Sequence, residues 1–303
     1  MTPRDGRPEA RERGAILIVV LMVLIIMSLI VMQFSFSMTV NRMTAINMTE
    51  SAQLRYLAEG GLEYAKNVLR VDRQRNDTDS LHDSWNEIRP PFEPPFKVEV
   101  KVYDECGKLN VNALVQGGNV NIPMKNTLER LFLDLDINIE AVHRLVDYMD
   151  PDSDGEFEDG AKNAPLTNLT ELMEIEYITP EAFFGRGEGE DREPGLADLL
   201  TVHGSGKVNI NTAPPKVVMA LFGKNESELG AFEDYRERNA IKSLEELPPL
   251  GMTNLDEVGS IIGFSSNTFR VVSRAKGDRL SRTVEAVVIR SPRKIRVLER
   301  RCY

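Results

Sequence analysis

The chain has 303 residues, of which 42% are hydrophobic, so it is long enough for one large or two smaller folded domains. Its formal net charge of −10 argues against a general affinity for nucleic acid, because phosphate binding depends on clustered Lys and Arg. The two cysteines and three histidines form no CxxC pair and no zinc-ligand pattern. If the bulk of the chain is exported, one disulfide between Cys106 and Cys302 and two free thiols both fit, and both alternatives stay open.

The first predicted element is a membrane-spanning helix. Eighteen consecutive residues, Ala15 to Met32, contain one weakly polar member, Ser28. At about 1.5 Å per residue they nearly match the hydrocarbon thickness of a bilayer, and they exceed the roughly 7–15 apolar residues of a signal peptide. No convincing small-residue cleavage pattern follows in residues 33–42. An arginine excess precedes the run, which predicts a cytoplasmic N-terminus and an exported remainder.

The helical pattern continues beyond the membrane span. Small and apolar residues recur at three- and four-residue spacing, including Ala58, Leu62, Ala65 and Leu69. This spacing predicts one long helix whose exported half is amphipathic and packs on a sheet. The alternative is an anchor followed by an independent helix. The Gly60-Gly61 pair is the one strain on continuity, at about 1 kcal/mol per glycine.

A split sheet with a large insert follows. The segment from Phe96 to Glu105 alternates apolar and polar residues, which predicts a half-buried strand. Near the C-terminus, two β-rich runs flank Gly277-Asp278 and predict a hairpin. Between them lie helical patterns such as TLERLFLDL and EAVHRLVDYM. The predicted fold class is α+β, with a long N-terminal transmembrane helix packed on a small antiparallel sheet and a large inserted helical domain.

The insert contains a short internal sequence repeat. The segment GKLNVNAL, residues 107–114, returns as GKVNINTA, residues 206–213, with six of eight positions identical or conservatively replaced. We interpret the pair as a duplicated turn that leads into a helix in each half. For the second copy, Thr212 is the predicted N-cap of a helix that begins at Pro214-Pro215.

The densest group of carboxylates lies in DPDSDGEFEDG, residues 150–160. Oxygen ligands at alternating positions suit calcium. The segment matches the start of an EF-hand loop but has Ala161 at the twelfth position, where a bidentate Glu is required, so an EF-hand is disfavoured. A solvated loop without a ligand is the alternative. The candidate calcium ligands are Asp150, Asp152, Asp154, Glu156 and Asp159.

The charged N-terminal segment that ends in Gly14 resembles the leader of type IV pilins and type II secretion pseudopilins. The resemblance implies cleavage after Gly14 by a prepilin peptidase and methylation of Ala15 as the new N-terminus. Most such subunits carry Glu at the fifth mature position, where this chain has Val19. A buried carboxylate offsets its desolvation only beside a neighbour's ammonium. The missing Glu is a feature of the K-type minor pseudopilin, which sits at the fibre tip.

The order of motifs is similar to that of the type II secretion minor pseudopilin K, or general secretion pathway protein K, family: DECGKLNVNAL after a strand, LVDYMDPDSD, NAPLTNLTELMEI, KVNINTAPPKVVMALF and terminal strands. The resemblance implies five parts, which are a leader (1–14), a transmembrane helix (15–36), a pilin-like helix and first strand (37–106), an inserted α-domain of the SAM or helix-hairpin-helix type (107–265), and a C-terminal hairpin and tail (266–303).

The same resemblance implies a non-enzymatic subunit in the bacterial inner membrane, with a single span and a periplasmic C-terminal domain. It implies minor pseudopilins of the I and J types, a prepilin peptidase and the inner-membrane assembly platform as partners. Calcium sites in the α-domain are a further feature of the family, which supports the loop of residues 150–160 as a site.

Three alternatives stay open at this stage. The segments VNINTAPPKVVMALF and YRERNAIKSLEELPPL resemble helix-hairpin-helix modules of exported DNA-uptake proteins. The linker FGKNESELGAFED between them holds three Glu, one Asp and one Lys, which disfavours phosphate binding. The other two are a minor pilin of a type IV pilus and a single-pass anchored periplasmic binding protein.

Overall fold

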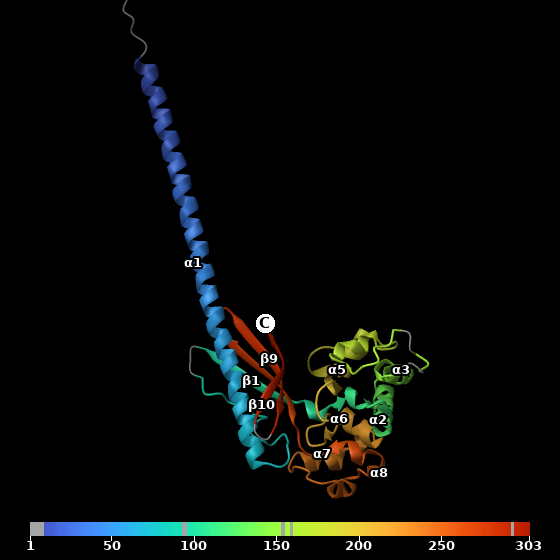
Figure 1. The fold of residues 1–303 in the computed structure, drawn as a ribbon. Helices are drawn as coiled ribbons and strands as arrows, with labels where there is room; N and C mark the ends of the chain where they lie inside the picture. Colours follow the sequence, from blue (N-terminus) through green and yellow to red (C-terminus); the bar gives the residue numbers. More distant parts are fainter. Residues whose placement is uncertain (1–8, 93–95, 153–154, 158–159, 292–293) are drawn as a thin grey trace, which may run out of the picture.

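A computed structural model describes residues 9–92, 96–152, 155–157, 160–291 and 294–303. Its most extended element is α1 (Glu9–Arg75), one uninterrupted helix of 67 residues. The N-terminal half projects away from the rest of the molecule, and the C-terminal half packs along a sheet (Figure 1). The prediction of a single continuous helix is therefore confirmed.

The sheet has four antiparallel strands in the order β1-β8-β9-β10. They are β1 (Lys97–Asp104), β8 (Thr268–Lys276), β9 (Ser281–Arg290) and β10 (Ile295–Cys302). The first strand and the β8–β9 hairpin are as predicted. The prediction that a tail follows the hairpin is wrong, because Ile295–Cys302 form the edge strand β10. Its residues are mostly exposed on both faces and rich in Arg, so β10 lacks the apolar alternation that identifies a half-buried strand.

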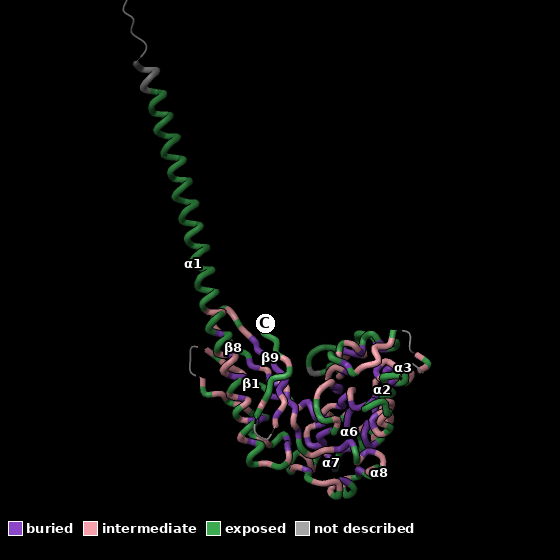
Figure 2. Tube along the Cα trace, in the orientation of Figure 1, coloured by how far each residue is buried: buried purple, intermediate pink, exposed green. Residues whose placement is uncertain are grey.

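The buried stripe of α1 lies against one face of the sheet (Figure 2). A Cβ atom at Gly61 would lie 2.2 Å from the Ser273 hydroxyl and about 3 Å from Val98 and Val100 side-chain carbons. Helix and sheet approach so closely here that a larger residue does not fit without a shift. The glycine that costs helix propensity thus permits the packing of the helix on the sheet. The stripe residues on α1 are Leu54, Ala58, Leu62, Ala65 and Leu69.

The inserted domain lies between β1 and β8 in the chain and on the side of the sheet away from α1 (Figure 1). Its α-helices are α2 (Ile122–Asp134), α3 (Glu140–Met149), α4 (Pro180–Phe184), α5 (Leu196–Leu199), α6 (Pro215–Phe222), α7 (Gly230–Arg236) and α8 (Leu255–Val258). Its two-residue strands are β2 (Leu109–Asn110), β3 (Val115–Gln116), β4 (Asn119–Val120), β5 (Leu200–Thr201), β6 (Val208–Asn209) and β7 (Ile262–Gly263).

Short 3-10 turns join these elements: η1 (Glu105–Gly107), η2 (Val111–Ala113), η3 (Leu169–Glu174), η4 (Gly189–Asp191), η5 (Glu226–Glu228), η6 (Leu244–Glu246), η7 (Pro248–Leu250) and η8 (Gly259–Ile261). The two helical patterns read from the sequence correspond to α2 and α3. The buried apolar residues of the insert form one cluster, and those between α1 and the sheet form another. The molecule therefore has two cores, which meet across a polar joint.

Candidate functional site: anchor, repeated turns and joint

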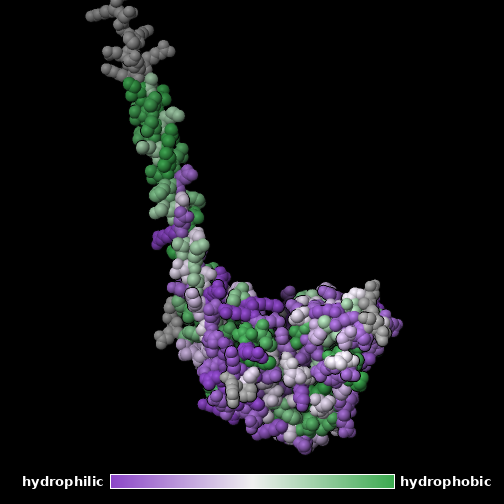
Figure 3. All heavy atoms as spheres, in the orientation of Figure 1, coloured by the Kyte–Doolittle hydropathy of each residue, from purple (hydrophilic) through white to green (hydrophobic). Residues whose placement is uncertain are grey.

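The apolar half of α1 is long and hydrophobic enough to cross a membrane. Its mean hydropathy reaches 3.4 over eighteen residues, and none of that window is buried in the molecule (Figure 3). Gly14, Ala15 and Val19 lie on this helix and are exposed, and no atom lies within 4 Å of where a Cβ at Gly14 would be. The helix is consistent with a single-pass anchor. Cleavage after Gly14 and the role of Val19 stay predictions.

The proposed calcium loop is described in part, because Asp154 and Asp159 lie outside the described residues. Asp150 is the C-cap of α3, and Asp152 and Glu156 are exposed. The sequence reasoning missed Asp147, whose Oδ2 accepts a hydrogen bond from the Phe157 backbone N–H at 2.9 Å. Its place one turn before Asp150 on the helix was the available signal. Calcium binding in this loop stays a prediction.

The internal sequence repeat corresponds to two turns with the same local geometry. In the first, Asn110 Oδ1 accepts a hydrogen bond from the Asn112 backbone N–H at 3.0 Å, and β2 pairs in parallel with β5. In the second, Asn209 Oδ1 accepts from the Asn211 backbone N–H at 3.2 Å, and β6 pairs in parallel with β7. The prediction of a duplicated turn is therefore confirmed.

The second asparagine of each turn holds a distant backbone segment by both amide atoms. Asn112 accepts from the Leu166 N–H at 2.8 Å and donates to its carbonyl oxygen at 2.9 Å. Asn211 accepts from the Ile241 N–H at 2.7 Å and donates to its carbonyl oxygen at 2.9 Å. A side-chain amide presents one donor edge and one acceptor, which is the match for one residue's backbone pair. Each turn thereby fixes a loop far along the chain.

The predicted N-cap role of Thr212 is wrong. The N-cap of α6 is Pro214, which has an extended backbone and no side-chain cap. The Thr212 hydroxyl instead donates to Asp104 Oδ2 at 2.6 Å. A carboxylate accepts a stronger hydrogen bond than a neutral group provides, so the nearby Asp104 outcompetes the local cap. The duplicated turn is in this way connected to the end of β1.

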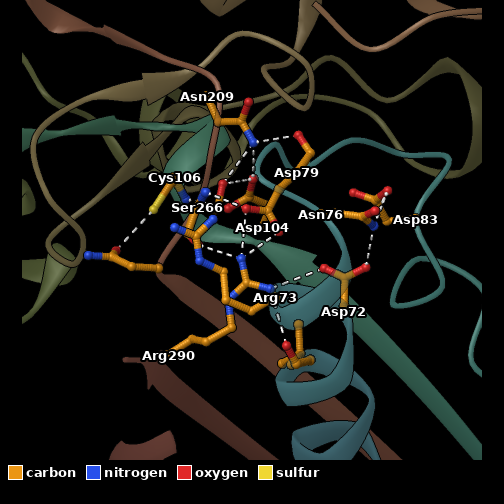
Figure 4. Close-up of polar contacts among 12 residues, drawn as sticks. Asp72, Arg73, Asn76, Asp79, Asp83, Asp104, Cys106, Asn209, Ser266 and Arg290 are labelled. Atoms are coloured by element: carbon orange, nitrogen blue, oxygen red, sulfur yellow. Dashed lines mark hydrogen bonds and ion pairs between the residues drawn. The ribbon is translucent and has the colours of Figure 1, made fainter. Parts of the chain in front are cut away.

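Asp104 is the first of two charged centres in the joint between the pilin-like part and the insert (Figure 4). Its Oδ2 accepts from Asn209 Nδ2 at 3.0 Å, from Thr212 and from the Ser266 hydroxyl, and its Oδ1 accepts from the Cys106 N–H at 2.8 Å. Burial raises the pKa of this carboxyl to about 6, although the hydrogen bonds favour its charged form.

The second centre is Arg290, at the end of β9. Its side chain is 1% exposed and pairs with Asp72 at 3.2 Å and with both carboxylate oxygens of Asp79. It also donates to the backbone carbonyls of Leu69 and Ser266. Burial, followed by the charges of Asp83 and Asp79, raises the pKa of the Asp72 carboxyl to about 6. The guanidinium is thus held by α1, by the loop after it and by the segment just before β8 (Figure 4).

Asp79 is the residue that connects the two centres. The Ser266 backbone N–H donates to its Oδ2 at 2.7 Å, and the Asn209 amide donates to its backbone carbonyl at 3.0 Å. The joint therefore links α1, the loop after it, β1, the second repeated turn, the segment just before β8, and β9. Charge-assisted hydrogen bonds are directional, so this network fixes how the insert sits on the sheet.

Three acidic side chains of the joint, Asp72, Asp79 and Asp83, have oxygens within 4.8 Å of one another. Among the described residues this is the one acidic group close enough to share an ion. Arg290 already pairs with two of them, and Asn76 donates to Asp72 and Asp83. The positive charge that such a group requires is thus supplied by the protein itself.

Both cysteines are free thiols in the structure, so of the two alternatives the disulfide is not formed. Cys106 is buried beside the joint, and burial raises the pKa of its thiol to about 11. Cys302 is exposed on β10.

Two known proteins are similar to this chain, one in sequence and one in fold. Type II secretion system protein K of Pseudomonas aeruginosa is 24% identical over 310 residues, which cover 95% of this chain and 92% of that protein. No protein-family model matches the sequence. A chain of the crystal structure of the GspK-GspI-GspJ complex from the type 2 secretion system of enterotoxigenic Escherichia coli has the same fold, with a TM-score of 0.67 at 18% identity. The alignment covers 85% of this chain and 98% of that one.

The predicted resemblance to the type II secretion protein K family is confirmed, in sequence over nearly the whole chain and in fold. The predicted fold class, a long apolar helix on a small antiparallel sheet with a helical insert, is confirmed at this level. The joint is the feature of the structure that the sequence motifs did not disclose. None of its charged residues was among the predicted site residues.

Proposed function

We propose that the chain is a minor pseudopilin that caps the periplasmic pseudopilus of a type II secretion system as a non-enzymatic subunit. Val19 on the continuous helix α1 carries the proposal, because it offers no carboxylate to a subunit placed above it. The helical insert, held beside the sheet by the joint, adds bulk at the position where a further subunit would stack. No observation favours the type IV pilus or DNA-binding alternatives.

The anchor then lies in the bacterial inner membrane, with the N-terminus in the cytoplasm and the sheet and insert in the periplasm. The arginine excess before Ala15 supports this orientation. Prepilin peptidase removes residues 1–14 and methylates Ala15, and the inner-membrane platform lifts the subunit into the fibre. Minor pseudopilins of the I and J types are the proposed neighbours, since the solved structure of similar fold is a GspK-GspI-GspJ complex.

The calcium loop belongs to the same proposal. Asp147, Asp150 and Asp152 place oxygens near the end of α3, and the Asp147 carboxylate already fixes the loop through the Phe157 N–H. A calcium ion held there would stabilise the loop of the insert.

Mass spectrometry of the N-terminus, after co-expression with a prepilin peptidase, tests the assignment. The expected product begins at methylated Ala15. The matched control is Gly14→Ala, which changes the residue at the cleavage site and contacts nothing else within 4 Å; it should remain intact. An uncut wild-type chain, or cleavage beyond residue 33, would refute pilin-type processing and favour an anchored binding domain.

A further inference from the structure

A polar groove lies at the end of the molecule farthest from the apolar segment. It is formed by the end of α1 and the loop after it, the turn before β6, the segment after α7, and the turn at β7. From Gln33 to Arg75 the helix rises about 60 Å, at about 1.5 Å per residue, so the groove is remote from the membrane. Figure 1 shows the end of α1 and α7 together at this end of the molecule.

Four exposed cations line the groove: Arg75, Lys207, Arg238 and Lys242. Within the described part of the chain, none of the four forms an ion pair with a carboxylate. Most other cations of the insert are paired, as in Arg130–Glu257, Lys216–Asp134 and Arg236–Glu233. The groove thus gathers four cations without carboxylate partners on a chain of net charge −10.

The groove contains fewer negative than positive side chains. Two carboxylates, Asp77 and Asp83, line it. Asp83 accepts hydrogen bonds from Asn76 and from the Ser80 N–H, so its charge is directed to the loop rather than to the cations. His82 Nε2 donates to the Arg236 carbonyl at 3.0 Å and holds the loop against the insert. The two walls are therefore fixed relative to each other, and the cations face a defined space.

The volume and the lining of the groove favour an extended ligand over a small molecule. The groove measures about 1110 Å³, above the roughly 300–1,000 Å³ of pockets that enclose small molecules. Hydrogen-bonding side chains that suit a polypeptide backbone also line the groove: Thr78, Ser205, Asn239 and Ser265. A long polyanion such as nucleic acid would also meet the acidic remainder of the surface, which repels it.

We propose that this groove binds an extended, acidic segment of another protein. The cations supply charge complementarity, which steers and orients such a segment. The inference does not depend on the pseudopilin assignment, because it rests on the charges and shape of this surface alone.

Fluorescence anisotropy tests the proposal on the full-length chain in detergent micelles, with a fluorescein-labelled octaglutamate peptide as probe and octaglutamine as the neutral control. We expect octaglutamate to bind, to weaken as salt is raised, and to bind at least about tenfold more weakly to Lys207→Glu/Lys242→Glu. The matched control Lys101→Glu/Arg296→Glu changes the charge equally on exposed strand residues and should stay within about twofold of wild type.

The milder variant Lys207→Gln/Lys242→Gln guards against a folding defect, and the fluorescence of Trp85 checks its structure. It should lower the affinity for octaglutamate by severalfold. The proposal is overturned if octaglutamate does not bind, if the groove and control variants lose affinity equally, or if an eight-nucleotide single-stranded DNA binds about tenfold more tightly than the peptide.

Discussion

Replacing Arg290 by methionine removes the guanidinium from the joint and keeps much of the side-chain volume. Asp72 and Asp79, each 1% exposed, would lose the cation that both contact. Removal of one partner from a buried ion pair costs about 3–5 kcal/mol, because the remaining charge is left uncompensated. Proton uptake limits this cost, since the pKa of Asp72 is already raised to about 6 and would rise further without Arg290. We therefore expect a loss of about 3 kcal/mol in the free energy of unfolding at pH 7.5.

Urea unfolding followed by tryptophan emission measures this loss where it occurs. Trp85 is the single tryptophan of the chain and is buried, with its ring centroid 5.4 Å from that of Phe269 in an edge-on contact. The Arg290 guanidinium lies over the other ring of this stack, 4.8 Å from the Phe269 centroid. Emission therefore reports on the joint, and circular dichroism reports on the helices. The corresponding drop in thermal midpoint is about 10 °C.

Two further variants separate charge from packing. Arg274→Met makes the same substitution at an exposed position of β8 and should change the free energy of unfolding by less than about 0.5 kcal/mol. Adding Asp79→Asn to Arg290→Met neutralises one of the two carboxylates that lose their cation and should restore part of the loss. If Arg290→Met destabilises by less than about 1 kcal/mol and leaves the emission of Trp85 unchanged, the buried ion set does not hold the joint.

Three other predictions follow from the packing, the repeated turns and the pKa of Asp104. Gly61→Ala should destabilise by about 1–2 kcal/mol through the clash with the sheet, whereas Gly60→Ala, which meets a movable Phe92 ring, should be neutral or stabilising in the same thermal scans. Asn211→Ala should lower the free energy of unfolding by about 2–4 kcal/mol, because the buried backbone N–H and carbonyl of Ile241 lose their partner. Asn112→Ala should lower it by about the same amount if the two turns are equivalent, and losses that differ by more than about 2 kcal/mol would count against that equivalence. The pKa of Asp104 is about 6 in the folded state, above the usual 3.8, so the stabilising contribution of its protonated form is present below about pH 4 and is lost as pH rises through 6. In urea titrations, Asp104→Asn should therefore gain up to about 3 kcal/mol in stability relative to wild type between pH 4 and 7.5. The opposite trend would show that the hydrogen bonds to Asp104 outweigh its burial.

The sequence predicts those elements whose side chains alternate between core and solvent. The stripe of α1 and the inward residues of β8 and β9 are apolar at regular spacing, and so their partners follow. β10 escaped prediction because neither of its faces is buried in a core. The cap at Thr212 failed for a different reason, since its competitor Asp104 lies 108 residues away in the chain.

The sequence analysis did not predict the joint, although two of its charged residues interrupt apolar patterns in the sequence. Asp72 continues the stripe of Leu62, Ala65 and Leu69 at the next helical position, and it is buried like them. Arg290 continues the inward positions of Val288 on β9 in the same way. A charge on an apolar stripe requires a partner, and two opposite charges on facing stripes predict each other. Asp79, Asn209 and Ser266 carry no such mark, because polar residues in loops are ordinarily exposed.

The physical nature of the joint bears on how a helical insert can act at the end of a long helix. The two apolar cores of the molecule are separate, so the hydrophobic effect alone, which has no preferred direction, would leave the insert free to tilt against the sheet. Arg290 and Asp79 instead join the end of α1 to the loop after it and to the segment that leaves the insert, through directional contacts. We therefore expect the insert to move with α1 when the helix is displaced along its axis. In the proposed role, in which α1 is anchored in a membrane and the insert lies about 60 Å away, such a joint keeps the orientation of the insert fixed.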